Sequence, residues 1–557
     1  MNKPAVGTIG VTAMPKYKVL ILHAILGNTR KTILDHIYCY PMYRHGNLYA
    51  YHHLLAPLSP ELVSFPFDAV IVNYCFLAYR VLDDMYFDLR DKYGFLTDTA
   101  ALKIAITQDE YTWSAVLDDW LSFMNVDTIF SVVAHDLPEL FPTCSAKVPI
   151  KYALTGYNHP QDLARLDQFV QPFAERPIDV GTRVRLMPPH IGRAGFLKGR
   201  YAERFRDAAR EAGFVADIST RPEDVFAGDD WFRFLGSCRF AFVTKSGASL
   251  NDPRGAIRAR VAEFLRTHPE AAFDEVEAAC FPGLDGHDFS AISPRLFEAA
   301  AARTGLILIE DHYVDGLEPY RHYIPLQPDF SNLDEVFRLM RDEAAAEAMI
   351  EAAYRLLVQS DRFSYGAFVA QVLAEVEARR PQPRPATAAD FAKLQRHYER
   401  LAASQRLVME APPHWSRVAR FVGNRAQKQG QLAPLADLVA ARLGGSAARS
   451  VMAAEMASLG RLDPGLAGPA AEAINALAAD RWDLDAFSRL LADAPQLSAH
   501  DNYRDWGFCD YVYDPLERGQ LPQRETDGSW YNGSIVDVPT GSLSETRILS
   551  DDQPNNG

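Results

Sequence analysis

The sequence predicts an α/β protein built on largely parallel sheets, and three observations lead to this fold class. Short apolar runs rich in Val and Ile alternate along the chain with amphipathic stretches of helical length. That alternation is typical of a parallel sheet with helices on both faces. The chain has 557 residues, which is enough for two or three domains. A Pro-rich segment at 380–386 separates this pattern from an Ala-rich remainder, as a linker does.

The first domain is expected at residues 16–175, after a polar lead-in at 1–15. Buried strands are predicted where apolar residues run together, at 18–24, 67–73, 103–107 and 128–133. Helices are predicted between them at 29–43 and 115–124. These elements together indicate a Rossmann-like domain.

A second Rossmann-like domain is expected at residues 176–379. Gly213 follows the predicted helix 198–212, and glycine readily adopts the left-handed conformation that ends a helix. Further helices are predicted at 230–237, 274–279, 343–357 and 365–379, and others begin near Glu298 and Asn332. Strands are predicted at 240–244 and 306–310.

The remainder of the chain has a different composition. Residues 387–515 are Ala-rich and predict a mainly α-helical extension beyond the linker. Residues 516–557 carry DG, NG and TG turns and end in DDQPNNG, so we expect that tail to be largely disordered.

Composition and missing motifs exclude several classes of protein. With 57 basic and 72 acidic residues the net charge is −15, which argues against a nucleic-acid binder. Six scattered cysteines lack metal-binding spacing and suit a reducing cytoplasm. The first apolar run, of about nine residues, is too short to span a bilayer, so no transmembrane segment is expected. No Asp-x-Asp motif ends an early strand and no GxSxG occurs, so neither a metal site nor a serine hydrolase is predicted.

The most informative segment is 293–336, in which Glu298 stands at a predicted helix start. Open α/β sheets bind ribose-bearing ligands at the carboxyl ends of their strands, and a carboxylate there can hold sugar hydroxyls. The alternative is a solvent-facing Glu favoured by the helix dipole.

Basic residues precede or open the predicted helix at 198–212. Arg193 and Lys198 are candidates to stabilise a departing diphosphate, which carries negative charge. Ordinary surface charge is the alternative for these two residues, and Arg183 and Arg185 are interpreted as structural.

A loop with small residues follows the predicted strand 240–244. Ser246 and Gly247 could present backbone N–H groups to a phosphate, although the spacing matches neither GxGxxG nor a Walker loop. A plain turn after the strand is the alternative.

Candidates for a general base lie at the ends of strands in the first domain. Asp109 and Glu110 follow the third predicted strand, and His23 ends the first. His135 follows the fourth strand and is a further candidate. A structural role is the alternative for each of them.

Several sequence blocks together resemble a known family. They are QDEY, RPIDVGTRVR, DIS, WFRFLGSCRF, SGAS, SPRLFEA and HYIPLQPDFSNLDEV. In this order they are similar to a group of bacterial GT-B glycosyltransferases (group 1 family), related to the spore-maturation type. The resemblance implies two Rossmann-like domains that face a cleft, and a nucleotide-sugar donor bound by the second of them. It implies that Glu298 contacts the ribose, with Ser293 and Arg295 of SPRLFEA beside the donor. His287, Asp288 and Ser290 precede the predicted Glu298 helix and are expected near the donor phosphates.

The sequence departs from that family at two places. Many retaining members carry a second glutamate eight positions before the one that matches Glu298, and here that position is Ser290. Relatives tend to have an acidic residue just before SGAS, where this chain has Lys245. Stereochemistry therefore stays open.

The predicted function is transfer of a sugar (EC 2.4 class) from a nucleotide sugar to a glycan or to another hydroxyl on protein or lipid. We expect it to need neither metal nor cofactor and to serve surface polysaccharide assembly. The expected location is the cytoplasm, with peripheral association at the inner face of the membrane left open. The alternatives are a non-catalytic binder of nucleotide or glycan, a sugar-nucleotide epimerase of the same fold, and a chain whose role lies in its C-terminal region as a partner-docking module.

Overall fold

The computed structural model describes residues 16–24, 31–44, 47–54, 58–81, 83–226, 228–394, 396–397 and 535–536. These residues belong to two compact units. One holds the described residues from 16 to 33, from 47 to 102 and beyond 379, and the other those at 34–44 and 103–379. The predicted lead-in, most of the helical extension and nearly all of the tail lie outside the described residues.

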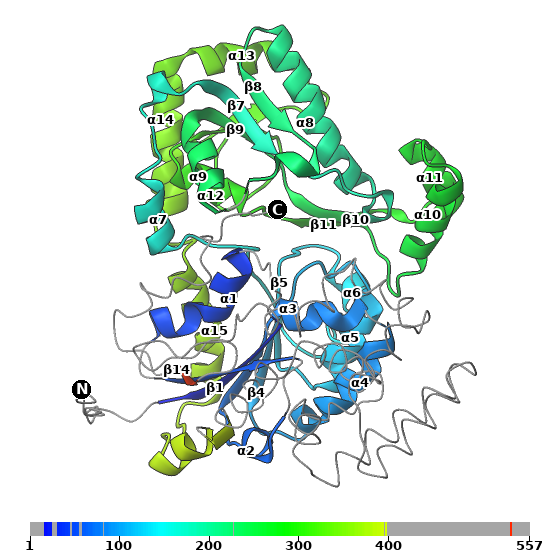
Figure 1. The fold of residues 1–557 in the computed structure, drawn as a ribbon, viewed down its shortest axis with the longest axis vertical. Coiled ribbons are helices and arrows are strands. Elements are labelled where there is room, and N and C mark those ends of the chain that lie inside the picture. Colours follow the sequence, from blue (N-terminus) through cyan, green and yellow to red (C-terminus); the bar gives the residue numbers. More distant parts are fainter. Residues whose placement is uncertain are drawn as a thin grey trace, which may run out of the picture. The chain divides into compact units, whose positions relative to one another are not determined.

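The first sheet has the strand order β14-β2-β1-β3-β4-β5-β6 (Figure 1). The neighbouring pairs β1–β2, β1–β3, β4–β5 and β5–β6 run parallel, and β14 (Ile535–Val536) pairs antiparallel with β2. The remaining strands are β1 (Lys18–His23), β2 (Leu48–His53), β3 (Ala69–Val72), β4 (Leu102–Ile106), β5 (Thr128–Ser131) and β6 (Ile150–Tyr152). The α-helices between them are α1 (Lys31–Tyr43), α2 (Pro60–Val63), α3 (Tyr74–Leu77), α4 (Asp83–Lys92), α5 (Ser114–Phe123) and α6 (Leu137–Leu140).

The second sheet has five parallel strands in the order β13-β12-β9-β7-β8. They are β7 (Ile178–Arg183), β8 (Ala216–Ser219), β9 (Cys238–Val243), β12 (Gly305–Ile309) and β13 (Ile324–Leu326). The accompanying helices are α7 (Pro160–Leu166), α8 (Arg193–Glu211), α9 (Gly228–Ser237), α12 (Arg295–Ala301), α13 (Leu333–Arg341) and α14 (Glu343–Tyr354). Helix α15 (Tyr365–Arg379) contacts the first sheet instead, where the Thr128 hydroxyl of β5 donates to Glu375 at 3.1 Å. The predicted α/β class with two parallel sheets is confirmed.

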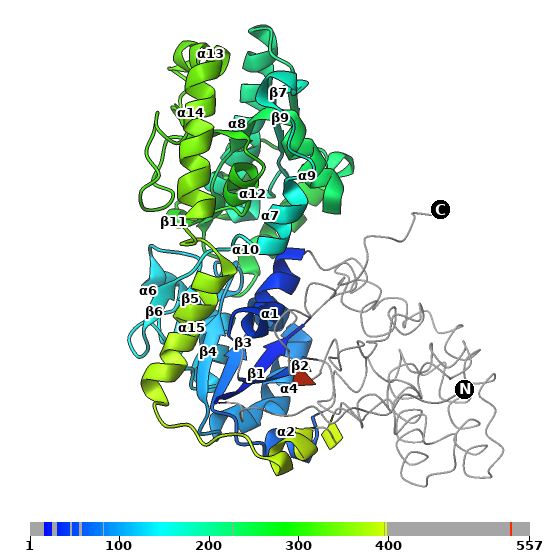
Figure 2. The same ribbon diagram turned by 90° about the vertical axis from the view of Figure 1, so that its left-hand side faces the viewer.

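Helices cover both faces of the second sheet, because alternate residues of each strand point to opposite sides. In β9, Phe240 and Phe242 pack with buried residues of α8 and α13. Ala241 and Val243 pack instead with buried residues of α9 and α12. Figures 1 and 2 show these helices around the sheet from two directions. The apolar run that predicted β9 is therefore buried on both sides, as in a doubly wound sheet.

An insertion leaves the second sheet after β9 and returns before α12. It consists of β10 (Ser246–Leu250), α10 (Ala256–Thr267), α11 (Phe273–Cys280) and β11 (Asp285–Ala291). Figure 1 shows β10 and β11 running out to these two helices. The strands form an antiparallel pair, and an apolar cluster around Val261, Phe273 and Val276 joins the helices.

The insertion is hydrogen-bonded to the loop that follows β4. Trp113 N–H donates to the Asp252 carbonyl at 2.9 Å, and Asp252 N–H donates to the Tyr111 carbonyl at 3.0 Å. Gly255, with φ +78°, lies so close to the Trp113 ring that an added Cβ would come within 2.1 Å of it. The end of β4 and the start of α10 therefore form one packed substructure.

Most of the predicted helices and strands match the structure, and the differences concern the start of one helix and several strands that were not predicted. The predicted helix 365–379 has the bounds of α15, and Glu298 lies in the first turn of α12. Helix α8 begins at Arg193, five residues before its predicted start. The strands β2, β7, β8, β10 and β11 were not predicted as strands. Within the described residues, no helix is both long and apolar enough to cross a membrane.

Candidate functional site

The strand order of the second sheet contains a topological switch point at one edge. The chain enters at β7, turns to β8 on one side and continues to β9 on the other, so the order reverses between β7 and β9. Ligands of doubly wound sheets bind at the carboxyl ends of the strands at such a switch point. Here that edge is formed by the loop 184–192 after β7 and by Thr244 and Lys245 after β9.

Lys198 brings a cation to this edge. It lies in the second turn of α8, half-buried, and its Nζ donates to the Ser246 hydroxyl at 3.0 Å. Ser246 opens β10, immediately after Lys245. Two of the predicted donor-binding residues, Lys198 and Ser246, are therefore in direct contact.

Arg193 points elsewhere in this structure. Its guanidinium forms ion pairs with Asp274, at 2.8 Å, and with Glu277 of α11. The hydrogen bond to Asp274, followed by that to Glu277, raises the pKa of Arg193 above its ordinary value. Its charge is thus neutralised by the insertion, and its role toward a diphosphate stays a prediction.

Gly247 lies within a strand and not in an open phosphate-binding turn. It pairs with Ser290 across the β10–β11 ladder, with φ at +103°. A Cβ at this position would come within 2.1 Å of the Phe289 carbonyl oxygen. Close approach of the two strands accounts for the glycine, whether or not a phosphate also binds there.

Glu298 is held in a defined orientation. Trp231 of α9 donates its indole Nε1–H to Glu298 Oε2 at 2.9 Å, and both side chains are half-buried. The Arg295 guanidinium lies 5.4 Å from the centre of the Trp231 ring. The carbonyl of buried Ser293 accepts the Leu296 N–H at 3.1 Å, at the start of α12. Glu298 is therefore placed by a neighbouring helix and does not project into bulk solvent.

Asp109 and Glu110 follow β4, but they occupy very different environments. Asp109 is exposed, has φ +50°, and accepts a hydrogen bond from the Tyr111 hydroxyl at 2.9 Å. Glu110 is fully buried, and its Oε1 accepts hydrogen bonds from the hydroxyls of Thr107 and Ser131, each at 2.8 Å. Burial raises the pKa of Glu110, against the lowering effect of those hydrogen bonds. Glu110 ties the ends of β4 and β5 together, and catalysis by either acid stays a prediction.

His23 belongs to the other compact unit and is fully buried in the first sheet. It is opposite His53 in the β1–β2 register, with ring centroids 5.4 Å apart. Burial, and then the neighbouring His53, lowers the pKa of His23 well below its ordinary value. Its imidazole is therefore neutral, and its proposed role as a base stays a prediction.

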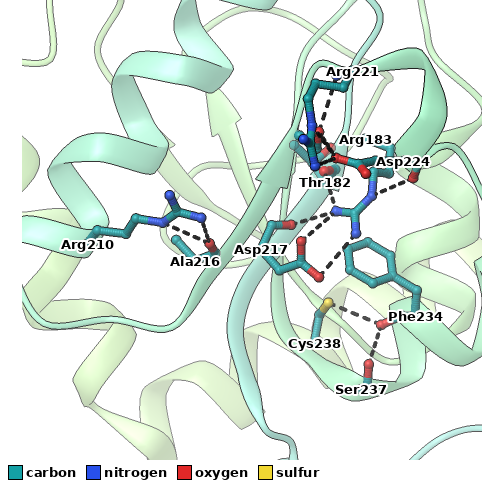
Figure 3. A network of polar contacts seen from close by, with 11 residues as sticks. Thr182, Arg183, Arg210, Ala216, Asp217, Arg221, Asp224, Phe234, Ser237 and Cys238 are labelled. Carbon is teal, nitrogen blue, oxygen red and sulfur yellow. Dashed lines mark hydrogen bonds and ion pairs between the residues drawn. The ribbon is translucent and has the colours of Figure 1, made fainter.

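Arg183, interpreted from the sequence as structural, lies at the carboxyl end of β7 within a dense network (Figure 3). Its guanidinium pairs with Asp217 at 2.9 Å and donates to the Asp224 carbonyl at 2.9 Å. It also lies 4.3 Å from the centre of the Phe234 ring. These contacts fix β7 against β8 and the loop beyond it, which makes this end of the switch point rigid.

A cluster of charged residues surrounds β11. It includes His287 and Asp288, which were expected near the donor phosphates, and His135, which was a candidate base; the sequence did not indicate that Asp136 joins them. Asp136, after β5, has φ +51°; its Oδ2 lies 3.6 Å from His287 Nδ1 and accepts the Asp288 N–H at 3.0 Å. His135 Nε2 lies 4.0 Å from Asp288 Oδ2. These pairs join residues far apart in the chain, so no local sequence signal marks them.

Lys245 connects this cluster to the edge of the second sheet. Its Nζ pairs with Asp311, after β12, at 2.8 Å. Burial acts to raise the pKa of Asp288, but hydrogen bonds from Ser290 and the charges of Lys245 and His135 outweigh it, so the pKa lies below the ordinary value. Among the described residues, no group of three or more His, Cys, Asp and Glu side chains has the geometry of a metal site.

No family model matches the chain. No curated protein matches it either. Solved structures to which the chain is similar include Anabaena HepE in complex with UDP-glucose, which is 12% identical over 64% of this chain and 100% of that one, with a TM-score of 0.36. An alpha-glucosyltransferase in complex with UDP and DNA is 11% identical over 65% of this chain and 99% of its own, with a TM-score of 0.37. Sucrose-phosphate synthase from Thermosynechococcus elongatus is 13% identical over 65% of this chain and 100% of its own, with a TM-score of 0.33. Likenesses of this size carry no conclusion about what the chain binds.

Proposed function

We propose that this chain transfers a sugar from a nucleoside-diphosphate sugar to a hydroxyl acceptor, without metal or cofactor. The observation that carries the proposal is the pairing of an oriented carboxylate with a cation at one edge of a doubly wound sheet. Glu298 would hold the ribose hydroxyls, and Lys198 would face the diphosphate.

The β10–β11 ladder brings these two groups toward one corner. Ser246, which holds the Lys198 ammonium, is opposite Ala291 in the ladder. From Ala291 the chain passes through Ser293 directly into α12, where Glu298 is in the first turn. One nucleotide that lies along this edge could therefore meet both side chains.

The chemistry needs a positive charge at the leaving group. When the bond between the anomeric carbon and the diphosphate breaks, the electron pair stays on the phosphate oxygen. A fixed ammonium stabilises that charge more than it stabilises the intact donor, so it lowers the barrier. Lys198, half-buried and already held by Ser246, is suited to this role.

The test is binding and turnover with a panel of UDP, GDP, ADP, CDP and TDP and their common sugar derivatives. A nucleotide at about 100 times its dissociation constant should stabilise the protein by roughly 2.7 kcal/mol, which raises the thermal midpoint. Lys198→Gln removes a charged contact of about 1.5–3 kcal/mol, so affinity should fall roughly 10- to 150-fold. Arg200→Gln, on an exposed residue of the same helix paired with Glu203, is the matched control.

A second candidate is a protein of the same fold that binds a nucleotide without turnover. Ser290 in place of a glutamate and the Lys245–Asp311 ion pair favour it. A nucleotide that binds while none of its sugar derivatives is consumed would support this second candidate. No binding by any member of the panel would overturn both.

A further inference from the structure

We propose that His287, oriented by Asp136, is the general base that takes the proton from the acceptor hydroxyl. This inference rests on the proposed function and deepens it, because it gives His287 a catalytic role, whereas the sequence predicted only that this residue lies near the donor phosphates. The evidence lies in three features: the placement of His287, the partner of its Nδ1, and the charges around it.

The ring of His287 is fixed by stacking. His287 and Phe289 lie two residues apart on β11, so they share a face, and their rings stack at 4.9 Å with an interplanar angle of 16°. Phe289 is fully buried, and Tyr111 from the loop after β4 stacks on it at 6.5 Å. The imidazole therefore has a defined plane on a rigid support.

The carboxylate of Asp136 lies beside Nδ1 of that ring. Its Oδ2 faces His287 Nδ1 at 3.6 Å and is itself held by the Asp288 N–H at 3.0 Å. A carboxylate beside Nδ1 favours the proton on that nitrogen, which makes Nε2 the proton acceptor. The His287 side chain is 32% exposed, so a dissolved acceptor can reach it.

The other predicted bases are less suited to this step. Glu110 is buried between β4 and β5, whereas Asp109 is exposed and accepts a hydrogen bond from the Tyr111 hydroxyl. His135 faces Asp288 at 4.0 Å, but its side chain is 67% exposed and its position is correspondingly less constrained. His287 combines partial exposure and a nearby carboxylate with a ring that is stacked on buried Phe289.

The charged groups that face His287 also connect it to the donor edge. Asp136 and Asp288 carry negative charge beside the ring, and His135 and Lys245 lie close to Asp288. Lys245 follows β9 at the switch point, one residue before the Ser246 that holds Lys198. The His287–Asp136 pair is thus a few residues along β11 from Ala291, which lies opposite Ser246 near the position proposed for the leaving diphosphate.

The step balances as a single displacement. The acceptor oxygen bonds to the anomeric carbon as its proton passes to His287 Nε2. The bond from the anomeric carbon to the diphosphate oxygen breaks, and its electron pair leaves with the nucleoside diphosphate. The imidazolium then releases its proton to water. A single displacement inverts the configuration at the anomeric carbon.

The experiment compares wild type, His287→Gln and Asp136→Asn with the donor panel above and with free monosaccharides and p-nitrophenyl glycosides as acceptors. His287→Gln should lower kcat/KM for transfer by roughly 10²- to 10⁴-fold and leave nucleotide affinity and the thermal midpoint unchanged. Asp136→Asn should give a smaller fall. The matched control is His312→Gln, because His312 forms an exposed pair with Asp315 at 3.7 Å.

A second variant separates chemistry from folding. His287→Ala leaves space for a free imidazole, so added imidazole should restore part of the transfer rate. Unchanged transfer in His287→Gln, an equal loss of nucleotide binding, or a product that retains its anomeric configuration would each overturn the assignment of His287 alone. If wild type turns over no donor, the proposed function fails together with it.

Discussion

The orientation of Glu298 by Trp231 gives the sharpest test of the donor site. Trp231→Phe removes the indole N–H that donates to Glu298 Oε2 at 2.9 Å, while an aromatic ring stays beneath the Arg295 guanidinium. The substitution therefore deletes one hydrogen bond and conserves most of the packing. If Glu298 binds the ribose, its carboxylate should lose its fixed direction.

The expected magnitude follows from the type and exposure of the bond. A hydrogen bond to a charged group contributes about 1.5–3 kcal/mol when it is well buried. Both side chains here are half-buried, so solvent screening reduces that value to about 1–2 kcal/mol. Nucleotide affinity should fall roughly 5- to 30-fold.

The measurement is a double-mutant cycle by calorimetric titration, with the nucleoside diphosphate that gives the largest thermal shift. Glu298→Gln alone should weaken binding at least as much as Trp231→Phe. The double variant should bind no worse than Glu298→Gln, because Trp231 acts through the carboxylate. Strictly additive losses would refute this reasoning, as would a Trp231→Phe protein with unchanged affinity.

Three further predictions concern stability. Arg176→Met should lower the free energy of unfolding by about 3 kcal/mol or more, measured by thermal denaturation, because its buried guanidinium donates to the carbonyls of Cys238 at 2.8 Å and Arg303 at 3.0 Å; a variant as stable as wild type would contradict this. Gly247→Ala should lower the free energy of unfolding by more than about 2 kcal/mol. Gly213→Ala, also at positive φ but with no atom within 4 Å of an added Cβ, should lower it by only about 1 kcal/mol. Equal losses in the two variants would exclude the close contact between β10 and β11 as the cause. Burial lowers the pKa of His36 from 6.5 to about 4, so as the pH falls the unfolded chain binds a proton at this residue before the folded chain does. About 3 kcal/mol of the free energy of unfolding should therefore be lost between pH 6.5 and pH 4. His36→Gln should make the free energy of unfolding less dependent on pH in this range, as measured by unfolding curves.

The sequence predicted those parts of the fold that local periodicity determines. The apolar runs of β1, β3, β4 and β9 and the amphipathic pattern of α15 appear where they were expected. The start of α8 was placed too late because its cap comes from elsewhere in the chain. Ser249 accepts the Ala194 N–H at 3.0 Å and Asp285 accepts the Arg193 N–H at 2.7 Å, across 55 and 92 positions.

The candidate site divides in the same way. Glu298 could be found because a helix start after a Ser-Pro pair is a local signal, and Lys198 because it lies in a strongly amphipathic helix. Strands β10 and β11 contain Gly, Ser and Asp in place of alternating apolar residues, so nothing local identified them. The His287–Asp136 pair forms because that hairpin packs against the loop after β5. The two residues are far apart in the sequence, so no local pattern could predict that they meet.

The two hydrogen bonds between Asp252 and the backbone at Tyr111 and Trp113 limit how this chain can be re-engineered. The insertion cannot be transferred to another protein by itself. Without residues 109–114, the Asp252 backbone would lose both hydrogen-bond partners, and Gly255 would lose its close contact with the Trp113 indole. Any chimaera that exchanges this insertion must therefore exchange both segments at once, and natural sequence changes at the two should occur together.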